Sequence, residues 1–158
     1  MKTSLRERFM AEGRLADCPI YDLHGHWGPH HAIHFPAADP SRARALLEQA
    51  NVRRLVICHH AALFSPDLGN RFNLEAVEAM PDILRAYCGI NGNYPDQIAV
   101  DLAAFDRHYP HAFVGFKLLA DYHKVAVNDA RCQPVWEMAH ARRLPVLLHT
   151  WGGSAYDG

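Results

Sequence analysis

Paired cysteines and long apolar runs are both missing from this 158-residue sequence. None of its four cysteines forms a Cys-x-x-Cys motif, and they stand far apart at Cys18, Cys58, Cys88 and Cys132. This spacing argues against a cysteine zinc site or a disulfide framework and favours the reduced thiols of a cytosolic protein. The first 17 residues are charged and lack the apolar core of a signal peptide, and no apolar run approaches a membrane span. We therefore predict a cytoplasmic protein without a membrane partner.

An excess of one charge is missing as well. Lys and Arg number 16 and Asp and Glu number 17, and the two signs are mixed along the chain. Without a basic stripe we expect no nucleic-acid partner. The sequence also lacks a Gly-x-Gly-x-x-Gly or phosphate loop, which argues against a nucleotide-binding module. The expected partner is a small-molecule substrate, and a homo-oligomer is an open alternative.

Short apolar segments of strand length alternate with amphipathic segments of helix length. The expected strands cover residues 19–24, 54–58, 83–90, 113–118 and 145–150, and the expected helices cover 4–12, 40–50, 68–80, 96–108 and 129–143. This alternation without hairpin signals predicts a parallel α/β sheet. The strands repeat roughly every 30 residues, and eight such units make a closed barrel of about 250 residues.

The predicted fold is therefore a (β/α)8 TIM-type barrel of which only about the first five β/α units are present. An open flavodoxin-type sheet also has five strands, but it normally ends in a covering helix and has no histidines after its first strand. This chain ends in a glycine-containing loop, 151–158. We expect residues 1–17 to form a helical segment, with a Ser4–Glu7 capping box, that packs against the body. Residues 18–158 would form the N-terminal portion of the barrel.

Ionisable side chains follow four of the five predicted strands. They are His24 and His26 after the first, His59 and His60 after the second, Lys117 in the fourth and His149 in the fifth. In parallel α/β folds the active site lies at the carboxyl ends of the strands, so these side chains are expected at one rim. His24 and His26, two residues apart in an extended chain, point the same way. Neutral imidazoles suit zinc, and Asp22 could orient one of them.

Each of these residues also has a plainer structural interpretation. His149 could bond to backbone at a strand end, Lys117 could be solvated, and Asp22 could cap local backbone. His59 and His60 point to opposite sides of a strand, so at most one is expected to face the barrel mouth. Loop histidines are solvated by default, with a minority near substrate; they are His30, His31, His34 and His123.

Three motifs together resemble the amidohydrolase superfamily. They are Asp22-Leu23-His24-Gly25-His26, Gly115-Phe116-Lys117 and Leu147-Leu148-His149-Thr150. The resemblance covers nearly the whole chain from residue 18 on, and it is strongest to the amidohydrolase-related branch that includes aminocarboxymuconate-semialdehyde decarboxylase-like proteins. It implies a divalent metal, usually zinc, with His24, His26 and His149 as ligands. A histidine on strand six and an aspartate on strand eight would complete such a site. Leu119 departs from many relatives, which have a histidine there.

The function expected from these features is that of a metal-dependent hydrolase or non-oxidative decarboxylase. A metal-activated water or a metal-polarised substrate would carry the chemistry, with Lys117 and His60 as catalytic residues. His59 and His123 are the candidate substrate-binding residues, and Asp22 would orient a ligand. Because the general base and the last strands are absent, the 158-residue chain alone is expected to be inactive. The alternative is a non-catalytic metal-binding or assembly fragment of an α/β protein.

Overall fold

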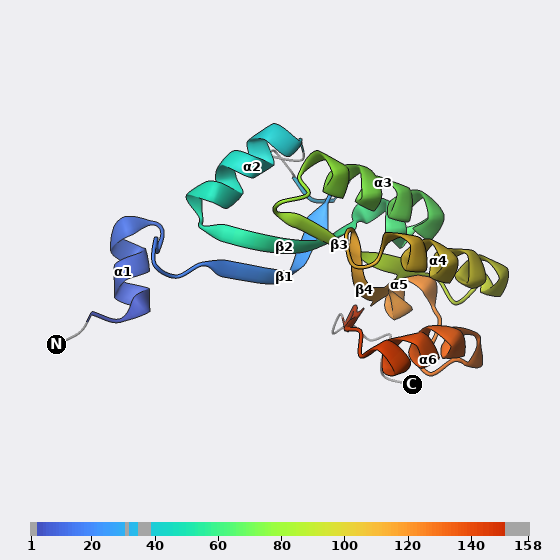
Figure 1. The fold of residues 1–158 in the computed structure, drawn as a ribbon. Helices are drawn as coiled ribbons and strands as arrows, with labels where there is room; N and C mark the ends of the chain where they lie inside the picture. Colours follow the sequence, from blue (N-terminus) through green and yellow to red (C-terminus); the bar gives the residue numbers. More distant parts are fainter. Residues whose placement is uncertain (1–2, 31, 35–38, 151–158) are drawn as a thin grey trace.

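Five parallel strands form a single sheet whose spatial order follows the order of the chain. A computed structural model describes residues 3–30, 32–34 and 39–150, so His31 and the predicted loop 151–158 lie outside the described residues. The strands are β1 (Ile20–Trp27), β2 (Val52–His59), β3 (Leu84–Ile90), β4 (Phe113–Leu118) and β5 (Val146–Leu148). The sheet curls into a half-barrel with helices on its outer side (Figure 1). The prediction of a parallel α/β sheet is confirmed, and the order β1-β2-β3-β4-β5 differs from the flavodoxin order, in which strand two lies outside strand one.

Proline determines where most of the covering helices begin. The helices are α1 (Leu5–Glu12), α2 (Pro40–Gln49), α3 (Pro66–Ala79), α4 (Pro95–His108), α5 (Ala120–His123) and α6 (Gln133–Arg142), with the 3-10 turns η1 (His60–Leu63) and η2 (Ala130–Cys132). Four of them, α2, α3, α4 and α6, have proline in the first turn, where its fixed φ and missing N–H cost nothing. Asp39 caps α2 by accepting from the Arg42 N–H, as its sequence predicts.

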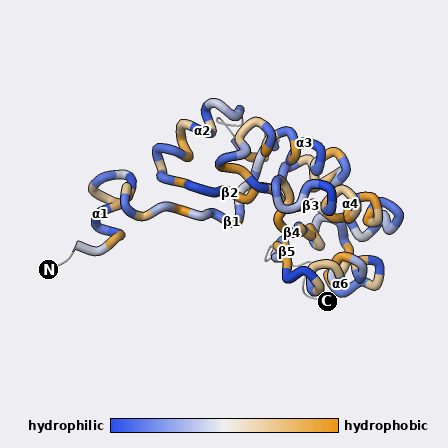
Figure 2. The backbone as a smooth tube through the Cα atoms, in the orientation of Figure 1, coloured by the Kyte–Doolittle hydropathy of each residue, from blue (hydrophilic) through white to orange (hydrophobic). Residues whose placement is uncertain are grey.

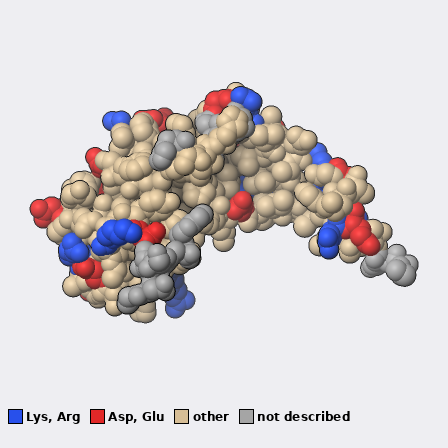
Figure 3. Space-filling model, turned by 180° about the vertical axis from the view of Figure 1, so that it is seen from behind, with Lys and Arg blue, Asp and Glu red and all other residues tan. Residues whose placement is uncertain are grey.

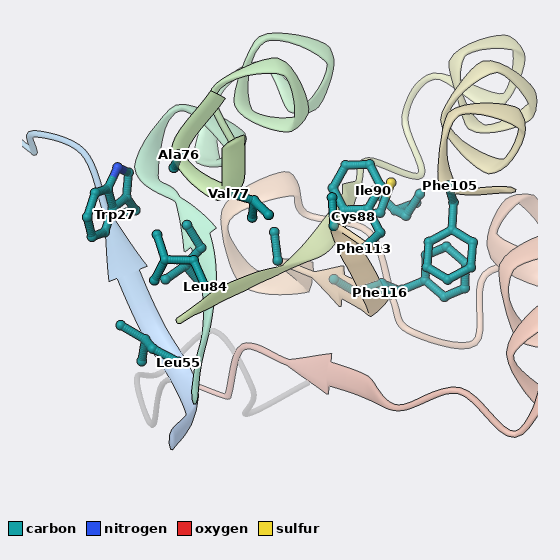
Figure 4. Close-up of a cluster of buried hydrophobic side chains, with 14 of the residues drawn as sticks. Trp27, Leu55, Ala76, Val77, Leu84, Cys88, Ile90, Phe105, Phe113 and Phe116 are labelled. Atoms are coloured by element: carbon teal, nitrogen blue, oxygen red, sulfur yellow. The ribbon is translucent and has the colours of Figure 1, made fainter. Parts of the chain in front are cut away.

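The hydrophobic core lies between the outer face of the sheet and its helices. Phe105 on α4 packs its ring 4.5 Å from Phe116 and 6.2 Å from Phe113, both on β4, and all three side chains are fully buried. Figure 4 shows this aromatic group at one end of the core and Trp27 with Leu55 at the other. Figure 2 shows the hydrophobic stretches of the backbone mainly in the sheet and in the helices over it. This packing fixes the sheet and therefore the strand ends that carry the site.

The prediction that the N-terminal helix packs against the body is wrong. No residue of α1 is buried, and Leu5, Phe9 and Met10 are 57%, 45% and 75% exposed. Figure 1 shows α1 apart from the sheet. The helix is locally determined: Ser4 and Glu7 form the expected capping box, and Gly13 ends it in the left-handed conformation. An apolar helix face indicates that a partner is needed, but not which surface provides it.

Charged side chains are scattered over the surface. On the face shown in Figure 3, acidic and basic side chains lie in small mixed groups separated by broad uncharged areas. None of the helices in the described residues is both long and apolar enough to cross a membrane. The cytoplasmic location stays a prediction.

Candidate functional site

A cavity of about 130 Å³ opens at the carboxyl ends of the strands. The structure brings together there side chains from β1, β2, β4 and the end of β5, and the polar members of the lining are His24, His26, His30, Cys58, His59, His60, Lys117, Tyr122 and His149. The rim expected from the strand ends therefore exists as one cavity. Within the described lining there is no carboxylate, so the donors are imidazoles, an amine, a thiol and a phenol.

His24 and His26 lie next to each other at the end of β1. Their ring centroids are 5.1 Å apart, with ring planes at 44°. The pairing of β1 with β2 shifts register between Asp22 and Gly25, so the strand is irregular where the histidines stand. Gly25 permits the close approach of the strands, because a Cβ there would lie 2.6 Å from a methyl of Leu55. Asp22 accepts from the His24 backbone N–H at 2.9 Å, so it orients His24 through the main chain.

His60 closes the cavity from the side of β2. It is 5% exposed, and its Nδ1 lies 2.8 Å from the Gly28 carbonyl oxygen. Because a carbonyl oxygen only accepts, Nδ1 carries the proton in this contact, and Nε2 is the acceptor nitrogen of the neutral ring. The ring stacks on His26 at 5.1 Å and 13°, and it lies 4.9 Å from His30.

His59 also lines the cavity, although strand alternation predicts that only one of the two histidines faces it. The reason is that β2 ends at His59 and the chain turns into η1 at His60, so the two-residue period no longer applies. The Nδ1 of His59 accepts from the Ala61 N–H at 3.0 Å and caps η1. Its ring lies 4.8 Å from that of Phe72. His59 therefore combines a structural contact with a place in the wall.

Lys117 is the most deeply buried ionisable side chain of the cavity. It is 1% exposed, and its Nζ has no hydrogen-bond partner within the described residues. Burial lowers the pKa of Lys117, an effect that the nearby Cys58 thiol opposes. An amine in this position gains a partner when an anionic or carbonyl oxygen enters the cavity.

His149 reaches the cavity from the opposite border of the sheet. Its backbone N–H donates to the Leu118 carbonyl at 2.9 Å, which extends the pairing of β4 with β5. Its ring lies 4.8 Å from that of Tyr122. His149 also lines a larger neighbouring cavity of about 560 Å³, with Asp121, Lys124 and Val125 among its other walls. It therefore stands between a small histidine-lined cavity and a larger one.

His123 is placed away from the cavity lining. Its Nε2 lies 3.2 Å from the Leu63 carbonyl, and its own carbonyl accepts from Asn93 at 2.6 Å. These contacts join α5 to η1 and to the segment between β3 and α4, so the structure gives His123 a bracing position. His34 is exposed. The sequence interpretation missed Cys58 and Tyr122 as lining residues. Cys58 stands two residues before His60 at a strand end, a signal that was available, whereas nothing in the sequence marks Tyr122.

Burial and nearby charge lower the pKa of three of the histidines that line the cavity, His24, His26 and His149. The pKa of His26 falls to about 4, first because of burial and then because of repulsion by His60, His24, Lys117 and His149. Burial followed by the charge of Lys117 also lowers the pKa of His24 and of His149. Neutral imidazole is the form that binds metals.

These residues fit a divalent metal in kind, and the separation of the proposed ligands His24 and His26 is compatible with one ion, as are those of His60 from His26 and His30. Two imidazoles bound to one tetrahedral zinc at about 2.0–2.1 Å place their ring centroids roughly 5 Å apart, and the His24–His26 separation is 5.1 Å. Within the described residues no three His, Cys, Asp or Glu side chains already stand as a metal-binding group.

No family model matches the chain, and a search of curated proteins gives no match. Function is therefore inferred from the fold and the site.

Proposed function

We propose that the chain forms five units of a (β/α)8 barrel and is a metal-dependent hydrolase or non-oxidative decarboxylase of the amidohydrolase-related type. The observation that carries this proposal is the shared cavity: His24 and His26 from β1 and His149 from β5 line the same space as buried Lys117. The sequential order of the parallel strands supports a barrel, because barrels are built from units in that order.

Three histidines would hold the metal, with zinc as the expected ion. His24, His26 and His149 supply neutral nitrogens and leave the remaining coordination position to water or substrate, as catalytic zinc sites do. Zinc held there would polarise a substrate oxygen and promote deprotonation of water. Asp22 fixes the backbone of His24 and so contributes to the direction of the ring.

Lys117 and His60 would act directly on the substrate. A substrate carboxylate or carbonyl oxygen would give the Lys117 amine the hydrogen-bond acceptor that it lacks among the described residues. His60 is held at Nδ1 by Gly28 and lines the cavity, so Nε2 would be its acceptor nitrogen toward a substrate. His59 forms part of the wall beside the substrate. Hydrolysis and decarboxylation use the same positioning of an oxygen between the metal and Lys117.

Zinc retention tests the proposal. The wild-type chain and the variants His24→Ala and His149→Ala are dialysed against zinc and then against metal-free buffer, and zinc is measured by elemental analysis. We expect the wild type to retain zinc and both variants to lose it. His140→Ala, which removes an exposed imidazole on α6, is the control and should retain zinc. Wild-type stoichiometry in His24→Ala would refute the ligand assignment.

The alternative function is metal binding without turnover. It is favoured by the absence of a carboxylate in the described lining of the cavity and by the exposure of most of β1 at the border of the sheet. We expect the zinc-loaded 158-residue chain to show no turnover of ester, amide or aromatic acid substrates. Metal-dependent turnover by this chain would favour the enzyme in its present form.

A further inference from the structure

The sheet separates between β2 and β3 at the level of the site. The pairing of these strands runs only from Leu55–Leu84 to Ile57–Ala86. On both sides the neighbouring pairs continue further, to Trp27–His59 between β1 and β2 and to Ile90–Leu118 between β3 and β4. The last residues of β2 and β3 therefore need other partners for their backbone groups.

The side chain of Asn73 on α3 occupies this separation. Its Oδ1 accepts from the His59 N–H at 2.8 Å, and its Nδ2 donates to the Tyr87 carbonyl at 3.1 Å. Asn73 is 0% exposed. One buried amide thus replaces the donor and the acceptor that β2 and β3 no longer offer each other. Because His59 N–H only donates and a carbonyl only accepts, the orientation of the amide is determined.

The turn that begins with His60 is seated against the same helix. A Cβ at Gly69 of α3 would lie 2.5 Å from the Ala62 nitrogen, so glycine is what lets η1 lie against α3. Ala62 is fully buried, and a Cβ at Gly89 would lie 3.1 Å from its methyl. Helix α3 therefore holds η1 by close packing and holds the residue before it by the Asn73 hydrogen bond.

We propose that Asn73 is a positioning residue of the histidine site, acting through the His59 backbone to place His60. From His60 the effect continues through the Nδ1 contact with Gly28 to the loop that follows His26. Asn73 itself is absent from the cavity lining, so it acts without touching substrate. The inference rests on the proposed function in that the site it serves is the metal site, but the contacts with His59 and Gly28 are independent of metal.

The first experiment needs no metal. Long-range ¹⁵N–¹H correlation spectra of the ring nitrogens report the tautomer of each histidine. In the wild type His60 should show the Nδ1–H tautomer, fixed by Gly28. In Asn73→Ala we expect this signature to be lost and the His60 ring shifts to move toward those of a mobile histidine. The signals of His140, far along the chain on α6, should stay where they are.

The second experiment uses Co²⁺ alone as the probe, followed by its visible absorption. The dissociation constant for Co²⁺ should rise in Asn73→Ala, because His60 stacks on the proposed ligand His26 and a displaced His60 leaves that ligand less well held. The absorption spectrum should also change, because the ligand set around the ion is less well held. Thermal unfolding of each variant, with and without Co²⁺, records the accompanying loss of stability.

Asn70→Ala is the matched control. Asn70 is an equally buried amide on α3, but it bonds to Gly89 on β3 and to Asp101 on α4. Its loss should reduce stability by a similar amount and leave the His60 tautomer unchanged. Asn73→Asp tests rescue: burial favours the neutral carboxyl, which can accept from His59 and donate to Tyr87 as the amide does. At a pH at which the wild type still shows the His60 signature, it should restore that signature.

Three outcomes would overturn the proposal. They are unchanged His60 signals in Asn73→Ala, an equal change in Asn70→Ala, and loss of the His60 signature in folded Asn73→Asp at a pH at which the wild type keeps it. If Asn73→Ala does not fold, the comparison of Asn73→Asp with Asn70→Ala decides by itself. Failure of the wild type to bind Co²⁺ would count against the proposed metal function, while the tautomer result would still decide the role of Asn73.

Discussion

The phenol of Tyr87 on β3 donates a hydrogen bond to the Leu23 carbonyl on β1 at 3.0 Å, spanning β2. Leu23 immediately precedes His24, and Tyr87 is 4% exposed. The contact therefore ties two non-adjacent strands together directly beneath the proposed ligands.

Tyr87→Phe should weaken this connection while keeping the ring in place. We expect a loss of about 1 kcal/mol in the free energy of unfolding, the usual value of one such hydrogen bond, and weaker zinc binding because the backbone before His24 is less well held. Urea unfolding and a zinc titration measure the two effects. Tyr94→Phe, at an exposed position, is the control and should change neither. Full zinc affinity in Tyr87→Phe would contradict the connection to the site.

Gly28 and Gly13 offer a matched pair for testing the loop after β1. Both have positive φ, +74° and +71°, but a Cβ at Gly28 would lie 2.0 Å from Nε2 of His59, whereas nothing lies within 4 Å of one at Gly13. Alanine at either position costs about 1 kcal/mol or more in backbone strain. Only Gly28→Ala should also displace His59 and weaken zinc binding. Equal stability and equal zinc affinity in the two variants would show that the loop adjusts freely.

Zinc affinity should depend on pH in a way that follows the lowered pKa values. A histidine ligand of ordinary pKa, about 6.5, competes with protons already below that pH. Since burial and neighbouring charges lower the pKa of His26 to about 4, the affinity should stay nearly constant from pH 8 to about 6 and fall steeply only nearer pH 5 and below. Chelator-competition titrations across this range measure it. A decline beginning near pH 7 would show that the ligands titrate like solvent-exposed histidines.

Asp101 on α4 should lower stability at neutral pH. It is 3% exposed, Oδ2 has no partner within the described residues, and burial raises its pKa. Because the folded state holds the proton more tightly than the unfolded state, stability falls as the pH rises from the unfolded pKa through the folded one. Asp101→Asn keeps the acceptor for Asn70 and Gln97 and removes the charge. It should gain on the order of 1 kcal/mol at pH 7 and lose this part of the pH dependence, as measured by urea unfolding at pH 3 to 7. An unchanged pH profile would contradict the assignment.

Strands and long helices were predictable because their signals are local and repeated. The apolar run 54–58 gave β2, and Asp39 with Pro40 gave the start of α2. The four-residue elements η1 and α5 are too short for a period to appear, so the sequence does not predict the turn at His60. The two-residue alternation of side chains fails at His59 and His60 for the same reason, because the strand ends where this turn begins.

The meeting of the site residues in one cavity could be predicted from the strand ends, but the contacts that hold those residues in place could not. His24, Lys117 and His149 stand where parallel strands deliver side chains, so their common cavity follows from fold class alone. Asn73 acts on backbone atoms of residues 14 positions away, and no residue type marks such a contact in a sequence. The free position of α1 was less hidden, since its cap is that of any stable helix but its apolar face is narrow, with Leu5 and Phe9 one turn apart in a mostly polar segment.

The nitrogens proposed to hold the metal come from the first and the last strand of the described sheet. The gap between them is therefore set by how strongly the sheet bends, and each strand in between contributes to that bend. A metal ion bound by ligands from both edge strands would hold those two edges at a fixed distance. Metal binding would therefore rigidify the whole curved sheet, and a change in the curvature between any two strands would weaken metal affinity.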